Sequence, residues 1–264
     1  MHVHLPKALH GWRELAREVG IIVLGVLIAL GFEQLVQSWR WSEQVRNTRK
    51  SLTSEIENSA LFAVERLAVQ PCLRNRILHL EAKLNSRNAE WTADPMVFGR
   101  YEVPGFTMTM PVAYEAPHRP HVTDIWETAK STGVIDHMDQ HEAHSFEYMY
   151  TNIDRLRASE DEESATMPQL SYLNFNVMMT PQLRPQSLVA LQRLDIINSQ
   201  AAGYSRQILS TVAGMHMHLG PPTWGGGFPT FEAARRRILS NDRQRYGNCV
   251  ADVRVSTPGS GGKS

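Results

Sequence analysis

The chain has 264 residues, 42% of them hydrophobic, which is enough apolar material for one good-sized core in addition to a membrane segment. Lysine plus arginine and aspartate plus glutamate number 27 each, so the formal net charge is zero. A chain without a positive field does not concentrate a phosphate backbone around itself, and this argues against nucleic acid as a partner.

The first element along the chain is an apolar segment near the amino terminus. Residues 19–32 read VGIIVLGVLIALGF, and apolar residues continue shortly beyond them. At about 1.5 Å per residue, such a helix crosses most of a hydrocarbon core about 30 Å thick. Trp39 and Trp41 follow, and tryptophan prefers the interface between lipid and water. We predict a transmembrane helix over 19–38, preceded by a short juxtamembrane segment over 1–18.

Two other interpretations of this segment stay open. A buried core helix is the first, because the uninterrupted apolar run is short for a membrane span. A cleaved signal peptide is the second, because Ala29, Leu30 and Gly31 supply small residues where a signal peptidase could cut. Against cleavage, the segment before the run is long and carries Glu14 and Glu18. We therefore favour an uncleaved span in the lipid bilayer.

The orientation of the span is not decided by charge, because basic residues flank it about equally on both sides. The simplest topology leaves the short amino-terminal tail inside the inner (cytoplasmic) membrane and exports the rest to the periplasm. Cys72 and Cys249 lie too far apart for a local CxxC motif. In an oxidising compartment we expect them to form one long-range disulfide; inert buried thiols are the alternative.

The pattern after the span predicts a stem helix. Residues 34–70 contain no proline or glycine, and their apolar positions recur at helical steps. We expect Pro71 to end this helix and a second amphipathic helix over 73–84 to fold back against it as a helical hairpin. Residues 88–120 then predict one long packed loop, which could include a small β-hairpin formed by two β-like runs at 97–103 and 106–112.

Two further helices are predicted in the middle of the chain. Thr123 is placed to cap a short helix that Gly133 ends. A longer helix opens at Asp139, and Glu142 completes a capping box with it. We expect this helix to end near the acidic run 160–163, interpreted as a solvated turn because buried carboxylates without partners are costly.

The carboxy-terminal third carries the strongest helical pattern. Residues 185–219 show a coiled-coil-like heptad seam sustained over three repeats. A glycine and proline loop follows, then a helix over 230–246 that Gly247 ends. Residues 256–264 are expected to form a disordered tail. The predicted fold class is therefore mainly α, with a bundle-like helical extramembrane domain over 39–255.

The stretch Arg17 to Trp41, REVGIIVLGVLIALGFEQLVQSWRW, resembles the anchors of a family of uncharacterised bacterial single-pass membrane proteins. The corner at Pro71, Cys72 and Leu73 and the later IWETAKSTGVIDHM segment, at 125–138, resemble the same family. The resemblance implies an amino-terminal anchor followed by a helical domain. It implies no activity, substrate or catalytic residue.

The sharpest candidate for chemistry is the group His137, His141 and His144. Histidines three and four apart share a helix face and could hold one zinc ion. If Asp139 is the cap, however, His137 lies before the helix, so solvent-facing histidines are the simpler interpretation.

The run Met215 to His218 offers copper ligands, but residues two apart in a helix point to different sides. Similarly, Arg235 to Arg237 are most simply interpreted as a solvated basic face.

No residue is predicted to be catalytic or to bind a metal or cofactor. The leading interpretation is a non-enzymatic interaction or scaffold module of the cell envelope that binds another membrane or envelope protein, or itself. A homodimer could form through Gly25 and Ala29, a small-xxx-small face in the span. The alternatives are a metal-binding protein or metal-dependent enzyme that uses the histidine group, and an envelope sensor domain that acts through a membrane partner.

Overall fold

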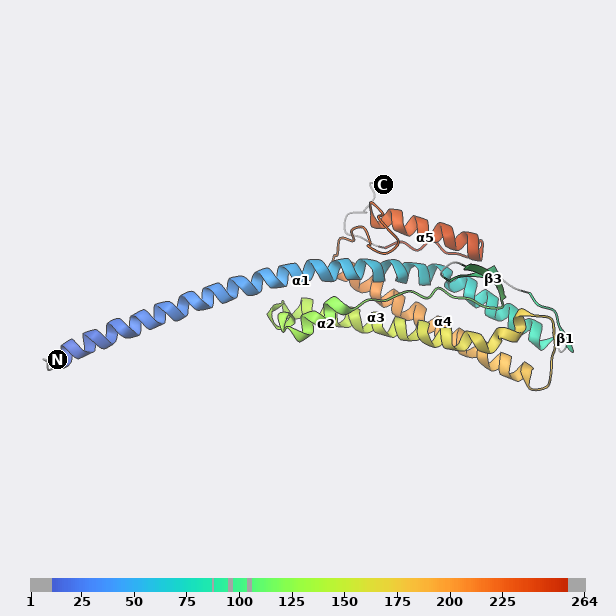
Figure 1. The fold of residues 1–264 in the computed structure, drawn as a ribbon, viewed down its shortest axis with the longest axis horizontal. Helices are drawn as coiled ribbons and strands as arrows, with labels where there is room; N and C mark the ends of the chain where they lie inside the picture. The colour runs from blue at the N-terminus through green and yellow to red at the C-terminus, as the bar shows by residue number, and fades with distance from the viewer. Residues whose placement is uncertain (1–10, 87, 95–96, 104–105, 256–264) are drawn as a thin grey trace.

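The computed structural model describes residues 11–86, 88–94, 97–103 and 106–255; for Glu14, 97–103 and 106–111 it describes the backbone alone. The fold is mainly α. Its dominant element is helix α1 (Trp12–Asn85), a single helix of 74 residues. The amino-terminal part of α1 projects alone from the rest of the molecule (Figure 1). That part is long and apolar enough to cross a membrane, and none of its apolar window is buried.

The remaining helices pack around the carboxy-terminal half of α1. Helices α3 (Gln140–Thr166) and α4 (Leu183–Gly214) cover one side of it, and α5 (Phe231–Tyr246) covers the opposite side (Figure 1). Val45 is the first buried residue of α1 among those described. The bundle therefore begins only a few residues after Trp39, the tryptophan expected to mark the membrane boundary.

The predicted helical hairpin at Pro71 is wrong, because Pro71 lies inside the continuous helix α1. A proline in a helix interior removes one backbone hydrogen bond and opens the carbonyls near it. Here neighbouring carbonyls bind other segments: Ala68 O accepts from Ala251 N at 2.9 Å and Gln70 O accepts from Asn198 Nδ2 at 3.4 Å. Helix α4 and the segment after α5 therefore contact α1 beside Pro71, and these contacts stabilise the helix across the proline.

The predicted β-hairpin is confirmed. Strands β2 (Val97–Val103) and β3 (Phe106–Val112) pair antiparallel from Val97 with Val112 to Val103 with Phe106. A second small sheet was not predicted: β1 (Glu90–Trp91) pairs with β4 (Val177–Met178) at the end of the bundle far from the span. Two-residue strands give no periodic signal in a sequence.

Two of the later helices begin directly after the residues predicted to precede them, Thr123 and Asp139. Helix α2 (Asp124–Ser131) follows Thr123, whose side chain makes no capping hydrogen bond, and ends before Gly133, whose φ of 73° is left-handed. Helix α3 begins after Asp139, whose carboxylate accepts from the backbone N–H groups of His141 and Glu142. The second half of the predicted capping box is wrong. The Glu142 carboxylate instead accepts two hydrogen bonds from Arg49 of α1, at 2.5 and 2.7 Å.

Of the two carboxy-terminal helices, α5 (Phe231–Tyr246) lies at its predicted position, whereas α4 (Leu183–Gly214) ends before the predicted seam does at 219. Thr230 caps α5 by accepting from Ala233 N, and Gly247 ends it at a φ of 86°. The predicted seam of α4 packs against α1 and α3 of the same chain, with Leu194, Ile197 and Ala201 buried. Two short 3-10 helices, η1 (Val134–His137) and η2 (Met167–Asn174), flank α3. The predicted tail 256–264 lies outside the described residues.

The bundle contains two hydrophobic clusters, one after the other along α1. The first lies nearer the span and gathers α1 residues from Val45 to Cys72 with parts of α2, α3, α4 and α5. The second gathers α1 residues from Val69 to Leu84 with Trp91, η2 and the start of α4. A layer of polar side chains lies where the two clusters meet.

Candidate functional site: a buried polar layer beside an open pocket

The polar layer starts from two neighbouring residues of α1, Glu65 and Arg66, each only 1% exposed. An amphipathic helix on a protein surface cannot bury two consecutive charged residues, because they point to different sides. Helix α1 can, because α3 and α4 cover one side of it and α5 covers the other (Figure 1). Each of the two charges is met by a partner from a different segment.

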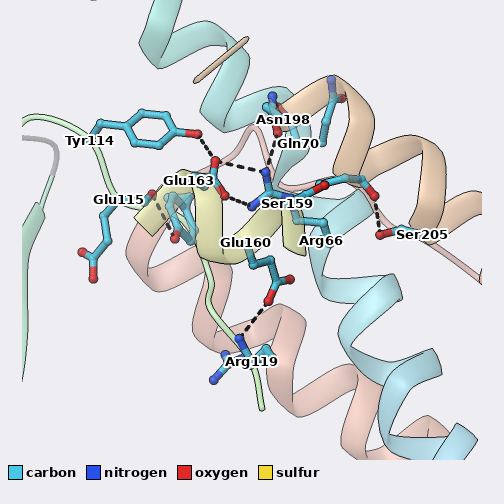
Figure 2. A network of polar contacts seen from close by, with 12 residues as sticks. Arg66, Gln70, Tyr114, Glu115, Arg119, Ser159, Glu160, Glu163, Asn198 and Ser205 are labelled. Carbon is cyan, nitrogen blue, oxygen red and sulfur yellow. Dashed lines mark hydrogen bonds and ion pairs between the residues drawn. The ribbon is translucent and has the colours of Figure 1, made fainter. Parts of the chain in front are cut away.

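Arg66 forms the centre of the first group of contacts (Figure 2). Its guanidinium donates to both carboxylate oxygens of Glu163 in α3, at 2.6 and 3.1 Å, and to Asn198 Oδ1 in α4 at 3.2 Å. The Tyr114 hydroxyl donates to Glu163 Oε1 at 2.6 Å. Three helices and the loop before α2 therefore meet at one planar, bidentate ion pair, a geometry that fixes their relative positions.

Glu65 forms the second group with Arg119 from the loop before α2. Arg119 Nε donates to Glu65 Oε2 at 2.6 Å, and Nη2 contacts the other oxygen. The Arg119 guanidinium also lies over the Trp224 ring, 4.6 Å from its centroid. Its backbone N–H donates to Glu160 Oε2 at 3.0 Å, as Figure 2 shows. Arg119 thus joins α1, α3 and the glycine-rich loop after α4.

His121 completes this side of the layer. Its Nε2 lies 3.3 Å from Glu160 Oε2. Neither ring nitrogen has a hydrogen-bond partner with acceptable geometry among the described residues. The ring meets Phe62 edge-on, with centroids 5.4 Å apart.

Burial changes the protonation behaviour of the layer. It raises the pKa of Glu65, an effect that Arg119 opposes, and together with Glu163 it holds the pKa of the Tyr114 hydroxyl well above its usual range. Burial and the nearby Glu65 raise the pKa of Asp242, on α5, to about 7. Raised carboxyl pKa values are expected here, because buried carboxylates outnumber guanidinium groups in the layer.

This raised pKa predicts that stability falls as pH rises from about 4 to about 7. Asp242 binds its proton more tightly in the folded state than in the unfolded chain, so its contribution is complete below about pH 4 and is lost by about pH 7. Chemical denaturation at several pH values measures this effect. The free energy of unfolding should decrease by up to about 1 kcal/mol per pH unit in this range, and Asp242→Asn should remove the decrease. A slope equal in both proteins would contradict the assignment to Asp242.

An open pocket of about 510 Å³ lies beside the layer. Residues 112–119 form one wall, η2 and Ser164 form another, and Arg245 lies at the edge. Its lining includes Tyr114 and Arg119, which are held by Glu163 and Glu65. The layer therefore holds two side chains of the pocket wall in place. The layer offers no activated nucleophile beside a base.

The prediction that the acidic run 160–163 forms a solvated turn is wrong. Helix α3 continues to Thr166, and Glu160 and Glu163 are 2% and 1% exposed. A signal was present in the sequence: Met149, Ile153 and Leu156 step by four and three, and the two glutamates continue that spacing. They therefore lie on the buried face of the helix, where Arg66, His121 and the Arg119 backbone meet them.

The three candidate metal-binding histidines do not converge. His137 lies in η1 and stacks on Trp41, with centroids 3.9 Å apart. His144 is exposed, and its nearest charged contact is Glu147 at 3.7 Å. Among the described residues, no three His, Cys, Asp or Glu side chains come together in a way that could hold a metal ion.

The other sequence candidates also separate. His216 and His218 are exposed whereas Met217 is 9% exposed and packs in the first hydrophobic cluster, so this run presents no shared face. The predicted solvated basic face is wrong for Arg235. Its guanidinium is largely buried and binds Glu232 at 2.7 Å and Asp252 at 2.7 Å, while Arg236 and Arg237 are exposed.

The two cysteines meet beside the layer. The structure joins Cys72 of α1 to Cys249 after α5 in a disulfide, with Cα atoms 5.1 Å apart. The adjacent hydrogen bond from Ala251 N to Ala68 O lies on the preceding turn of α1. Together they fasten the segment after α5 to the helix at the point where Pro71 interrupts its hydrogen bonding.

Comparisons with protein-family models, with curated proteins and with solved structures found no match to this chain.

Proposed function

We propose that this protein is a non-catalytic, membrane-anchored helical module of the bacterial envelope that binds another envelope protein or a second copy of itself. The observation that carries the proposal is the continuity of α1, which runs without a break from the apolar segment into the centre of the bundle. A bundle built around the anchoring helix itself has a fixed distance and orientation relative to the membrane. Such rigidity suits a scaffold, which must present a surface at a defined height.

Two further features support an exported binding module. The disulfide between Cys72 and Cys249 suits an oxidising compartment such as the periplasm. On α4, Val189 and Ile196 are 65% and 60% exposed and lie two helical turns apart on one face. Exposed apolar side chains on the same helix face are suited to contact with a partner.

Photocrosslinking in cells tests the proposal. A photoreactive amino acid at Val189 or Ile196 should give a light-dependent adduct with an envelope protein or with a second copy of the chain. Arg236 on α5, which is also exposed, serves as the matched control and should give none. Absence of any adduct from both α4 positions in membranes that contain the folded protein would contradict this proposal.

We expect the protein to stay in the membrane fraction through high salt and alkaline wash, and to retain its amino terminus. The reason is that the apolar part of α1 has no protein partner to bury it in the described structure. An intact-mass measurement on the purified protein checks this. A mature chain beginning near Phe32 would mean that the segment is a cleaved signal peptide.

We also expect a homodimer whose span contact uses Gly25 and Ala29. Both lie on the bare part of α1, and small residues let two helix backbones approach closely in lipid. Replacing both by leucine should weaken association, measured by crosslinking or mass photometry in detergent. The matched control is Val23→Leu, which lies on another face of the helix and should leave association unchanged. If the unaltered protein is found only as a monomer in these measurements, the prediction of a homodimer is wrong.

A further inference from the structure

We propose that the turn η1 rests on phospholipid headgroups and gives the bundle a second contact with the membrane, beside the span. The turn follows α2, which lies at the end of the bundle nearest the bare part of α1 (Figure 1). This inference rests on the membrane anchor of the proposed function, but it concerns a different surface from the α4 face.

The contact between η1 and α1 sets the height of the turn above the hydrocarbon. The His137 ring stacks on the Trp41 ring, with centroids 3.9 Å and planes 21° apart. Trp41 lies three residues beyond position 38, the end of the predicted span, which is a rise of about 4.5 Å. The headgroup layer on each side of a bilayer is about 5–7 Å thick. His137 therefore lies at the level of the headgroups when α1 spans the bilayer.

Several contacts hold η1 against α1 at this height. Val134 begins the turn and Met138 follows it; they are 6% and 9% exposed and belong to the first hydrophobic cluster, against which Trp41 also packs. At the start of α3, the Glu142 carboxylate accepts two hydrogen bonds from Arg49 of α1, at 2.5 and 2.7 Å. The turn is therefore a fixed part of the bundle, and it moves away from the headgroups only if α1 itself tilts.

The chemistry of the exposed surface around η1 fits headgroups and not acyl chains. Between positions 131 and 140 every exposed residue is polar: Ser131, Thr132, Asp136, His137, Asp139 and Gln140. These side chains offer hydrogen-bond donors and acceptors, which zwitterionic phospholipids can meet with their phosphate and ammonium groups. Polar groups buried in hydrocarbon would lose these partners at a cost of several kcal/mol each. The turn should therefore touch the membrane surface without entering it.

A second contact would restrict the tilt of the molecule. A single transmembrane helix is tilted by about 20° on average, with a wide range. The η1 turn contacts α1 and the start of α3, so it lies to one side of α1. Tilting toward that side would push polar side chains of η1 into the hydrocarbon, which is unfavourable. The turn thus limits how far the bundle leans toward the membrane on this side.

Depth-dependent fluorescence quenching on the full chain in phosphatidylcholine vesicles tests the proposal. A fluorescent amino acid replaces Asp136 in η1, Arg157 in α3 or Val23 in the span, one position at a time. The quencher is a nitroxide, carried either on the lipid headgroup or deep in the acyl chain. At position 136 we expect the headgroup nitroxide to remove most of the fluorescence and the acyl-chain nitroxide to remove less. Arg157, which is exposed and about 25 Å further along α3, is the matched control and should be quenched by neither.

Position 23 separates failure of this inference from failure of the anchor. If position 23 is quenched by the acyl-chain nitroxide while position 136 is quenched by neither, η1 stands clear of the membrane and the inference is wrong, although the anchor stands. Stronger quenching at position 136 by the acyl-chain nitroxide, or equal quenching at positions 136 and 157, would also overturn the inference. If neither nitroxide quenches position 23, the anchor fails, and the proposed function fails with it.

Discussion

Replacing Arg66 with methionine is expected to lower the free energy of unfolding by about 3–5 kcal/mol, the usual effect of leaving one partner of a buried ion pair alone. Arg66 is 1% exposed and binds both Glu163 and Asn198, so its loss leaves a carboxylate in the core without its main donor. Chemical denaturation of the full chain in detergent, followed by near-ultraviolet circular dichroism, measures the change.

Two further variants make this result specific. Arg157→Met removes an exposed ion pair with Asp154 on the same bundle and should cost less than about 1 kcal/mol. Adding Glu163→Gln to Arg66→Met should recover part of the loss, because it removes the unpaired charge while keeping the size of the side chain. Equal effects of Arg66→Met and Arg157→Met would show that the layer is not buried as described.

Loss of the disulfide is the second change with a large expected effect. Cys72 and Cys249 are separated by 177 positions, and closing a loop of that length stabilises a fold by up to about 5 kcal/mol on the chain-entropy model. The double variant Cys72→Ser, Cys249→Ser should therefore unfold at a lower denaturant concentration than the oxidised protein.

Reductant provides the internal control for this prediction. It should lower the stability of the unaltered protein and leave that of the double serine variant unchanged. If both thiols react with maleimide in protein denatured without reductant, the bond does not form in the cell, and the main support for export is lost.

Local signals in the sequence were sufficient to place several helix ends and the β-hairpin. Asp139, Thr230 and Gly247 act through atoms within three or four positions of themselves, so a linear pattern contains the whole interaction. Strands β2 and β3 are likewise neighbours in the chain, and their pairing is local.

The polar layer could not be predicted in the same way, because its partners are far apart in the chain. Whether Glu65, Arg66 and Glu163 are buried depends on α1 being enclosed on both sides, which no periodicity within α1 reveals. Pro71 illustrates the same limit: its local preference is to end a helix, but packing from α4 and the segment after α5 overrides it. Glu142 likewise satisfied a local motif and yet binds Arg49.

A distance measurement between spin labels at Ser38→Cys and Asn75→Cys, in the full chain reconstituted in nanodiscs, tests most directly whether the anchor and the bundle share one rigid helix. Both positions are exposed on α1, one before the bundle and one beyond Pro71. A continuous helix rises about 1.5 Å per residue, so we expect one narrow distribution centred near 55 Å. A broad distribution, or a much shorter distance from a chain that folds back at Pro71, would contradict a single helix joining the membrane to the core.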